Sequence, residues 1–235
     1  MPAHVVCPTL STMCSELLSG RPRAESGVDD DRYVRLLAVD PVLRSIARVQ
    51  GRPDPFAWFV AGGAGATNFA AMVLHIGSQQ ISTRAALAVF DRIQDAAGGR
   101  IDPARVDGLG PDRLRSLGLS RAKATAIVGV ARMHLDGTLD LDGLDDLDDA
   151  QVVHALTAAR GVGLWTAQMF LIHQLRRPDV LPAGDLGIRR AVQRCWSRPA
   201  LPPIEEVRQM GERWSPDRTY AAALLWASLR GGPDH

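Results

Sequence analysis

Residues 156–192 of the chain read LTAARGVGLWTAQMFLIHQLRRPDVLPAGDLGIRRAV. Apolar residues recur near helical spacing on both sides of Gly161-Val162-Gly163, which predicts two helices joined by a tight hairpin. A helix that begins directly after such a turn presents unpaired backbone N–H groups and the positive end of its dipole, and both suit a phosphate group. The hairpin is therefore interpreted as a clamp for a phosphate backbone.

A single carboxylate, Asp185, follows the hairpin after a loop that contains Pro182 and Gly184. An aspartate before Leu-Gly-Ile-Arg is a good helix cap, so one interpretation is that Asp185 only begins the helix at Leu186. The other is that its charge stabilises positive charge that develops on a reacting group. The spacing alone favours neither interpretation, and one residue can do both.

The rest of the chain also has helical patterns. Asp40-Pro41 predicts the start of a second helix within Arg32 to Val49. Further helices are expected over residues 69–77, 85–93, 114–119, 122–133, 186–196, 204–214 and 220–229. The acidic stretch Leu139 to Asp149 is expected to be a solvated connector rather than a strand. Since no block of alternating strands occurs, the predicted fold is all-α.

Composition limits the classes of protein. The 235 residues are 46% hydrophobic, enough for one domain or two closely packed subdomains. The formal net charge is +1, so a nucleic-acid-binding face would have to be local. Cys7, Cys14 and Cys195 are too few and too scattered for a disulfide framework or a four-thiolate iron-sulfur cluster, which favours a reducing cytoplasm. No apolar run reaches membrane-spanning length, so we expect no membrane partner.

Four blocks of sequence together resemble a known superfamily. RGVGLWTA (160–167), followed by LPAGDLG (181–187), resembles the helix-hairpin-helix DNA glycosylases, which have a Gly/Pro-rich loop and a catalytic aspartate. Within them, the chain looks like the DNA-3-methyladenine glycosylase II (AlkA-like) branch. The other matching blocks are IGSQQIS (76–82), LRSLGLSRAKA (114–124) and WSPDRTYAAALLW (214–226).

The resemblance implies an organisation and a partner. We expect a mobile leader over residues 1–30, a core over 31–230 made of two helical subdomains flanking a cleft, a tail over 231–235, and no N-terminal β domain. The partner would be double-stranded DNA with a damaged base, bound by a monomer associated with the nucleoid in the cytoplasm. Asp185 would be the catalytic residue, stabilising charge at C1′ of a flipped nucleotide or orienting the attacking water.

The resemblance also implies the walls of a base pocket. Trp165 and Trp226 would hold a flipped base between them, and an alkylated, positively charged purine stacks well on indole rings. Relatives that cleave the strand have a lysine at the position of Trp165, where a tryptophan cannot form a Schiff base. Lys123 is the sole lysine. We therefore expect base removal by water and no lyase activity. Core packing is the alternative role for Trp165.

The remaining implied contacts are with DNA and a cation. Gln80 would fill the gap left by the flipped nucleotide, whereas Gln79 is better explained as part of a polar turn. The residues expected to bind the DNA backbone are Gly161, Gly163, Thr166, Arg121 and Lys123, although Lys123 could instead be structural. The backbone carbonyls of Thr157, Ala159 and Val162 would bind Na⁺ or K⁺, and no other cofactor is expected.

Two alternatives to the alkylpurine glycosylase stay open. One is a glycosylase for deaminated or oxidised bases. The pair of tryptophans, and the absence of an iron-sulfur cluster and of a reactive lysine, distinguish the leading interpretation from it. The other is a non-catalytic DNA-binding module that uses the hairpin only as a clamp for damage recognition. His75 lies beside the turn that contains Gln80 and is the one histidine for which a role in the site is considered.

Overall fold

A computed structural model describes residues 29–57 and 66–229, and within these ranges it is helical and has no strand. The predicted all-α fold is confirmed. The helices are α1 (Asp30–Val39), α2 (Pro41–Gln50), α3 (Asn68–Ser78), α4 (Thr83–Ala96), α5 (Pro103–Ser116), α6 (Arg121–Leu135), the 3-10 helix η2 (Asp142–Asp146), α7 (Asp149–Thr157), α8 (Leu164–His173), α9 (Leu186–Cys195), α10 (Ile204–Glu212) and α11 (Arg218–Ser228). The predicted leader and tail lie outside the described residues, except for the last two residues of the leader.

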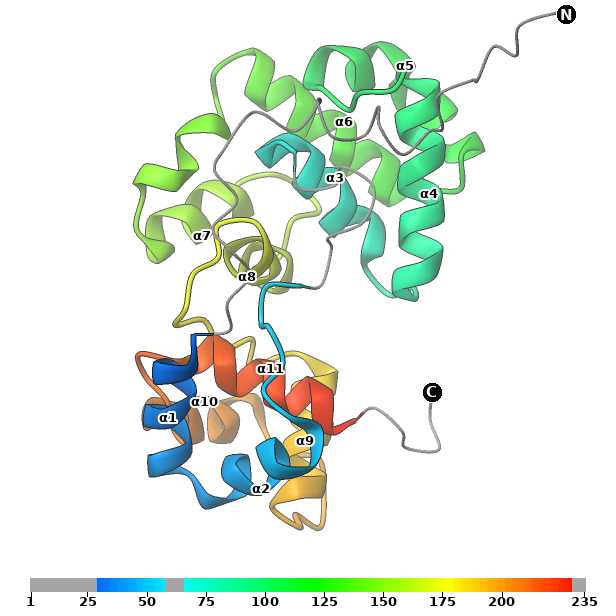
Figure 1. Ribbon diagram of the computed structural model, residues 1–235. Coiled ribbons are helices and arrows are strands. Elements are labelled where there is room, and N and C mark those ends of the chain that lie inside the picture. Colours follow the sequence, from blue (N-terminus) through cyan, green and yellow to red (C-terminus); the bar gives the residue numbers. More distant parts are fainter. Residues whose placement is uncertain (1–28, 58–65, 230–235) are drawn as a thin grey trace, which may run out of the picture.

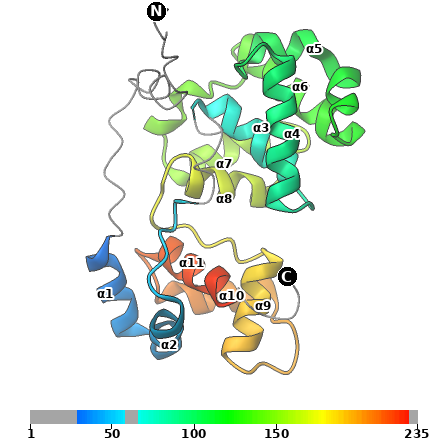
Figure 2. The same ribbon diagram turned by 45° about the vertical axis from the view of Figure 1, so that its right-hand side comes forward.

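The helices form two groups that come from different parts of the chain (Figures 1 and 2). Helices α3 to α8 form one subdomain, and α1, α2, α9, α10 and α11 form the other. Each has its own apolar core, the first around Met72, Ile127 and Phe170. The second surrounds Leu43 and Trp214. The described part of the chain therefore begins in the second subdomain, forms the first, and returns to the second between α8 and α9.

Side-chain caps explain several of the helix boundaries. Asp40 accepts hydrogen bonds from the backbone N–H groups of Val42 and Leu43 at 2.9 and 3.1 Å, directly before Pro41 begins α2. Its other oxygen accepts a hydrogen bond from the buried indole of Trp214 at 2.9 Å. The predicted Asp-Pro start signal is confirmed, and the same carboxylate also ties α2 to the segment after α10.

Helix α5 begins earlier than the sequence pattern predicts. The expected helix starts at Leu114, whereas α5 starts at Pro103, with Asp102 as its N-cap. Gly110 has a φ of +70° inside this helix and Pro111 follows it, so the segment is two helical pieces joined at a kink. Since glycine and proline interrupt the periodicity, the first piece leaves a weak signal.

The acidic connector is more buried than predicted. Leu139, Leu141 and Leu144 are almost fully buried in the core of the first subdomain. The aspartates between them face outward, and η2 forms the middle of the segment. The connector is thus not a strand, as expected, but the prediction of a solvated segment is wrong for its leucines.

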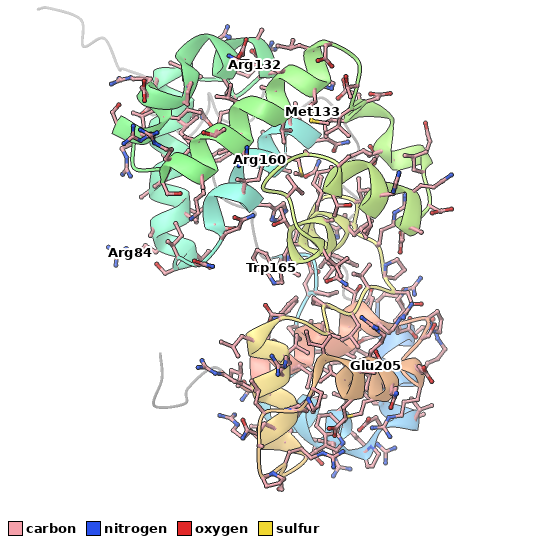
Figure 3. All side chains as sticks on the ribbon, turned by 180° about the vertical axis from the view of Figure 1, so that it is seen from behind. Arg84, Arg132, Met133, Arg160, Trp165 and Glu205 are labelled. Atoms are coloured by element: carbon pink, nitrogen blue, oxygen red, sulfur yellow. The ribbon has the colours of Figure 1, made fainter. Side chains whose placement is uncertain are left out.

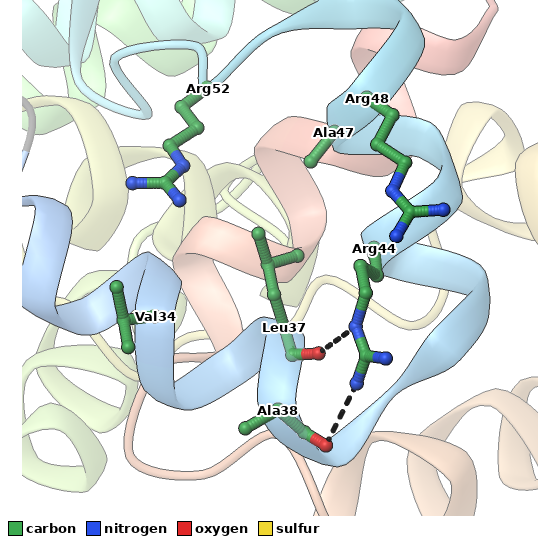
Figure 4. A pocket seen from close by; sticks show the side chains of 7 residues that line it. All are labelled: Val34, Leu37, Ala38, Arg44, Ala47, Arg48 and Arg52. Atoms are coloured by element: carbon green, nitrogen blue, oxygen red, sulfur yellow. Dashed lines mark hydrogen bonds between the residues drawn. The ribbon is translucent and has the colours of Figure 1, made fainter.

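A pocket of about 460 Å³ lies between α1 and α2 (Figure 4). Arg44 donates hydrogen bonds across it to the carbonyls of Leu37 and Ala38 at the end of α1. The pocket is lined by Val34, Leu37, Ala38, Arg44, Ala47, Arg48 and Arg52. None of the site residues expected from the sequence borders it. Among the described helices, none is both long and apolar enough to cross a membrane.

Candidate active site

The Asp185 carboxylate receives hydrogen bonds from three helices. Oδ1 accepts from the backbone N–H of Ile188 at 2.9 Å and from Nε1 of Trp226 at 3.0 Å. Oδ2 accepts from Nε1 of Trp165 at 2.8 Å. Asp185 is therefore the N-cap of α9, as one interpretation held, and its charge also lies between the two predicted pocket tryptophans. Three donors hold the half-buried carboxylate in one orientation.

These donors come from both subdomains. Trp165 belongs to α8 of the first subdomain and lies at the junction in Figure 3, whereas Asp185 and Trp226 belong to α9 and α11 of the second. The structure therefore brings together three residues that are 20 and 41 positions apart in the chain. Both indoles use their N–H edge toward the carboxylate.

Gly187 is a site residue that the sequence interpretation missed. A Cβ atom at this position would lie 3.0 Å from Oδ1 of Asp185 and 3.3 Å from Cδ1 of Trp226. The indole could not approach the carboxylate so closely past a larger side chain. A glycine two residues after a helix cap was the available signal, because glycine is unfavourable inside a helix unless something packs against it.

A buried histidine, His75, and a half-buried histidine, His173, lie behind Trp226. His173 of α8 stacks on His75 of α3 with ring centroids 6.0 Å apart, and its centroid is 6.3 Å from that of Trp226. Burial lowers the pKa of His75 to about 3 and the pKa of His173 well below its usual value. Both rings are thus neutral near pH 7. The sequence suggested His75, whereas His173 carried no signal of its own.

The hairpin between α7 and α8 has the geometry of a close backbone approach. Gly161 has a φ of +91°, and a Cβ there would lie 2.7 Å from Cβ of Ala126 in α6. Gly163 is the N-cap of α8 and supplies no side-chain hydrogen bond to the first backbone N–H groups of the helix. Both glycines are exposed. The first turn of α8 can therefore offer backbone N–H groups to an anion.

Thr166 does not present its side chain to DNA. It is 1% exposed, and its hydroxyl accepts a hydrogen bond from Nε2 of Gln79 at 2.9 Å. This corrects the expected backbone-binding role for the hydroxyl, because burial removes it from the surface. A phosphate contact from Thr166 would have to come from its backbone N–H in the first turn of α8.

Lys123 is structural rather than directed at a phosphate. Its ammonium group donates hydrogen bonds to the carbonyls of Gly77 and Gln79, at 2.9 and 2.5 Å, at the end of α3. Burial lowers its pKa. These contacts are those of the structural alternative that the sequence left open for Lys123, because a helix terminus occupies the charge.

Three exposed arginines supply positive charge near the hairpin instead. Arg121 begins α6, Arg160 lies in the hairpin, and Arg84 lies in the first turn of α4. Figure 3 labels Arg84 and Arg160 on the first subdomain. Within residues 29–57 and 66–229, none of these three arginines forms an ion pair. Arg121 was expected from the sequence, whereas Arg84 and Arg160 were not. A local basic face is thus compatible with a net charge of only +1.

Gln80 and the three carbonyls lie at the turns where they were expected. Gln80 is exposed between α3 and α4 and has a φ of +59°. Thr157 ends α7, and the carbonyl of Ala159 accepts a hydrogen bond from the N–H of Val162 at 3.1 Å. In the described part of the chain, no group of three or more His, Cys, Asp and Glu side chains could hold a metal ion.

Comparisons with known proteins point to DNA repair. The chain is 29% identical over 162 residues to DNA-3-methyladenine glycosylase 1 of Schizosaccharomyces pombe, covering 68% of this chain and 71% of the relative. It is 28% identical over 166 residues to DNA-3-methyladenine glycosylase 2 of Escherichia coli, covering 66% and 56%. The chain thus spans about half the length of bacterial relatives of this kind.

Solved structures agree. The fold matches that of the S. pombe 3-methyladenine DNA glycosylase Mag1 in complex with abasic DNA, with a TM-score of 0.73 and 25% identity over 83% of this chain and 95% of that one. A DNA-3-methyladenine glycosidase from Bacillus halodurans matches with a TM-score of 0.69 and 26% identity over 87% and 91%. Residues 73–216 match the family described as HhH-GPD superfamily base excision DNA repair protein. The chain therefore belongs to the HhH-GPD superfamily of base excision DNA repair proteins.

Proposed function

We propose that this protein is a monofunctional DNA glycosylase that flips alkylated purines out of duplex DNA and hydrolyses their N-glycosidic bond, leaving an abasic site. The observation that carries the proposal is the Asp185 carboxylate, held between the indole N–H groups of Trp165 and Trp226 where the two subdomains meet. The names of the relatives, DNA-3-methyladenine glycosylases, support the same class of substrate.

The geometry at Asp185 suits stabilisation of positive charge. As the bond between C1′ and the base lengthens, positive charge builds on the sugar, and a fixed carboxylate stabilises it in a partly buried site. Three N–H donors already engage the two oxygens, which favours an oriented, electrostatic role and orientation of the water over strong base catalysis. Alkylation at N3 or N7 weakens the bond, so modest assistance is sufficient.

The tryptophans can recognise such a base. Their N–H edges are engaged by Asp185, so the ring faces are the surfaces on which a flipped base would stack. A positively charged purine binds the negative face of an indole more strongly than a neutral purine does. The same pair thus orients the carboxylate and selects for electron-poor bases.

The proposed chemistry includes no strand cleavage through a Schiff base. Trp165 occupies the position where lyase-competent relatives have a lysine, and it has no amine to react. Lys123, the sole lysine, donates its ammonium hydrogen bonds to the end of α3 rather than toward Asp185. Water is therefore the proposed nucleophile.

DNA would be held by the hairpin and the exposed arginines. The backbone N–H groups after Gly163, in the first turn of α8, would bind one phosphate, and Arg84, Arg121 and Arg160 would add contacts that are sensitive to salt. Gln80 would enter the stack in place of the flipped nucleotide. We further propose that the protein acts as a monomer on chromosomal DNA in the cytoplasm.

We also propose that the hairpin carbonyls bind a monovalent cation. Thr157, Ala159 and Val162 contribute carbonyls at and beyond the C-terminal end of α7, where the helix dipole is negative. A bound Na⁺ or K⁺ would balance the partial negative charge of these carbonyl oxygens. It would also support the turn that presents its backbone to a phosphate. No other cofactor is proposed for the hydrolysis.

The test is a base-release assay on Asp185→Asn. The wild-type protein and the variant would be incubated in excess over duplexes that carry a single 3-methyladenine, 7-methylguanine, hypoxanthine or ethenoadenine. The free base would be measured by chromatography, and strand nicking would be measured with and without alkali. Asparagine keeps the capping oxygen but not the charge, so we expect excision to fall by at least about 100-fold with little change in DNA affinity. Asp146→Asn, on exposed η2, is the matched control.

Each alternative predicts another result. Tight binding without release of any base by the wild-type protein would support a non-catalytic damage-recognition module. Release of hypoxanthine but not of the methylated purines would support the glycosylase for deaminated or oxidised bases. Nicking without alkali would contradict the monofunctional reaction.

A further inference from the structure

Helix α6 contacts and restrains the turn that carries Gln80. Gln80 has a left-handed backbone with a φ of +59°, which costs a non-glycine residue free energy and persists only where the surroundings enforce it. Lys123 supplies that restraint, because its Nζ binds the carbonyls of Gly77 at 2.9 Å and Gln79 at 2.5 Å. The residue next to Gln80 is thereby held at the N-terminal end of α6.

The same turn is also hydrogen-bonded to the hairpin between α7 and α8. Nε2 of Gln79 donates one hydrogen bond to the hydroxyl of Thr166 at 2.9 Å and another to the carbonyl of Gly161 at 3.2 Å. These two acceptors lie on either side of the N-cap of α8. One glutamine side chain therefore bridges the turn that precedes α4 and the hairpin that precedes α8.

The hairpin also packs directly against α6. Gly161 lies so close to Ala126 of α6 that an added Cβ would be 2.7 Å from the alanine methyl group. Helix α6 thus contacts the hairpin through Ala126 and the Gln80 turn through Lys123, and Gln79 joins the other two directly. Each of the three segments therefore contacts the other two. This mutual restraint makes the arrangement more rigid than a contact between only two of them would.

We infer that Gln79 is a positioning residue that couples the Gln80 turn to the hairpin, so that Gln80 enters the DNA stack at a fixed distance from the phosphate bound by the hairpin. The inference deepens the proposed function and rests on it. A flipped nucleotide leaves a hole at a defined place relative to its own phosphates. A side chain that must fill this hole is effective only if its distance from the phosphate clamp does not vary.

The variants that test this role are Gln79→Leu and Thr166→Val. The first removes both hydrogen bonds to the hairpin, and the second removes only the buried hydroxyl acceptor while keeping the shape of the side chain. Gln94→Leu is the matched control, because Gln94 is a half-buried glutamine of α4 whose side chain forms no hydrogen bond with another described residue. Thermal unfolding would establish that each variant folds, and Thr166→Val carries the test if Gln79→Leu does not.

The activity readout compares two duplexes under single-turnover conditions. In one duplex the lesion is paired, and in the other it is mismatched and less costly to flip. On the paired lesion, we expect the maximal excision rate to fall about tenfold in Gln79→Leu and about threefold in Thr166→Val. The half-saturating protein concentration should change by less than about twofold, and the mismatched lesion should recover most of the rate. Unchanged rates, or equal losses on both duplexes, would overturn the inference.

A second readout needs no catalysis and separates the two proposals. 2-Aminopurine placed opposite an abasic-site analogue becomes fluorescent when a side chain disturbs its stacking. We expect wild type and Gln94→Leu to raise this fluorescence and Gln79→Leu to raise it much less at saturating protein. Equal fluorescence in all three would contradict the role of Gln79, whatever the excision assay shows. Absence of base release by the wild-type protein would instead contradict the proposed function.

Discussion

Gly187 stands where the carboxylate of Asp185 and the indole of Trp226 come together. It is the second residue of α9, and the space that its missing side chain leaves is filled by Oδ1 and by the indole edge. Catalytic geometry is sensitive at this scale, because a displacement of about 1 Å can cost about 100-fold in rate. A single methyl group is therefore a sufficient probe of the site.

Gly187→Ala should lower the excision rate by about tenfold to 100-fold, because its Cβ would push Trp226 or Asp185 from its position. It should not lower the melting temperature, because alanine is a better helix residue than glycine. Gly184→Ala is the control in the same loop, where a Cβ meets only Cδ1 of Ile204 at 3.7 Å. Excision rates that are the same for Gly187→Ala and wild type would show that the close contact at Asp185 has no role in the reaction.

At the scale of elements, the start of α2 is tied to the end of α10. Asp40 is fully buried, caps α2 with one oxygen and accepts the Trp214 indole N–H with the other. Arg213 adds an ion pair at 3.0 Å. A local cap, readable from the sequence, thus also serves as a tertiary contact within the second subdomain.

Asp40→Ala should lower the free energy of unfolding by about 3 kcal/mol, since it removes a cap and leaves the buried Trp214 N–H without its acceptor. Urea unfolding followed by circular dichroism would measure it. Asp102→Ala is the comparison, because Asp102 caps α5 at the surface and its loss should cost about 1 kcal/mol. Equal losses for the two variants would mean that the contact with Trp214 adds nothing.

The elements also show where pattern reasoning works. The boundaries of α2, α4 and α9 are marked by Asp40, Ser82 and Asp185, each of which caps its helix in the structure. The first half of α5 was missed because Gly110 and Pro111 break its periodicity. The leucines of the acidic connector were misjudged because their burial depends on a core built by other segments.

At the scale of the whole molecule, the stacked rings of His75 and His173 lie between the core of the first subdomain and Trp226 of the candidate active site. His75 and His173 come from α3 and α8 of the first subdomain, and the next ring in the series is Trp226 of the second. Both histidines are neutral in the folded protein because burial disfavours the charged ring. Their protonation is therefore linked to the unfolding of the first subdomain.

The free energy of unfolding should fall as the pH falls from about 6.5 toward 3. In this range the unfolded chain protonates His75, with a pKa near 6.5, whereas in the folded protein burial lowers that pKa to about 3. Burial lowers the pKa of His173 in the same direction, so its contribution has the same sign. The unfolded state then binds more protons, and each histidine contributes a slope of about 1.4 kcal/mol per pH unit. Urea unfolding at a series of pH values would measure the slope, and His75→Leu should reduce it by one histidine's share. An identical slope in this variant would refute the linkage.

The sequence by itself determined the helical fold, the hairpin and, through the resemblance, the family. Caps, turns and periodicity act over a few residues, so they can be read along the chain. It did not determine that both tryptophans donate to Asp185, that Gly187 makes room for one of them, or that Lys123 and Thr166 face inward. These outcomes depend on which atoms of distant helices come within hydrogen-bond distance, and only the packing of the two subdomains decides that.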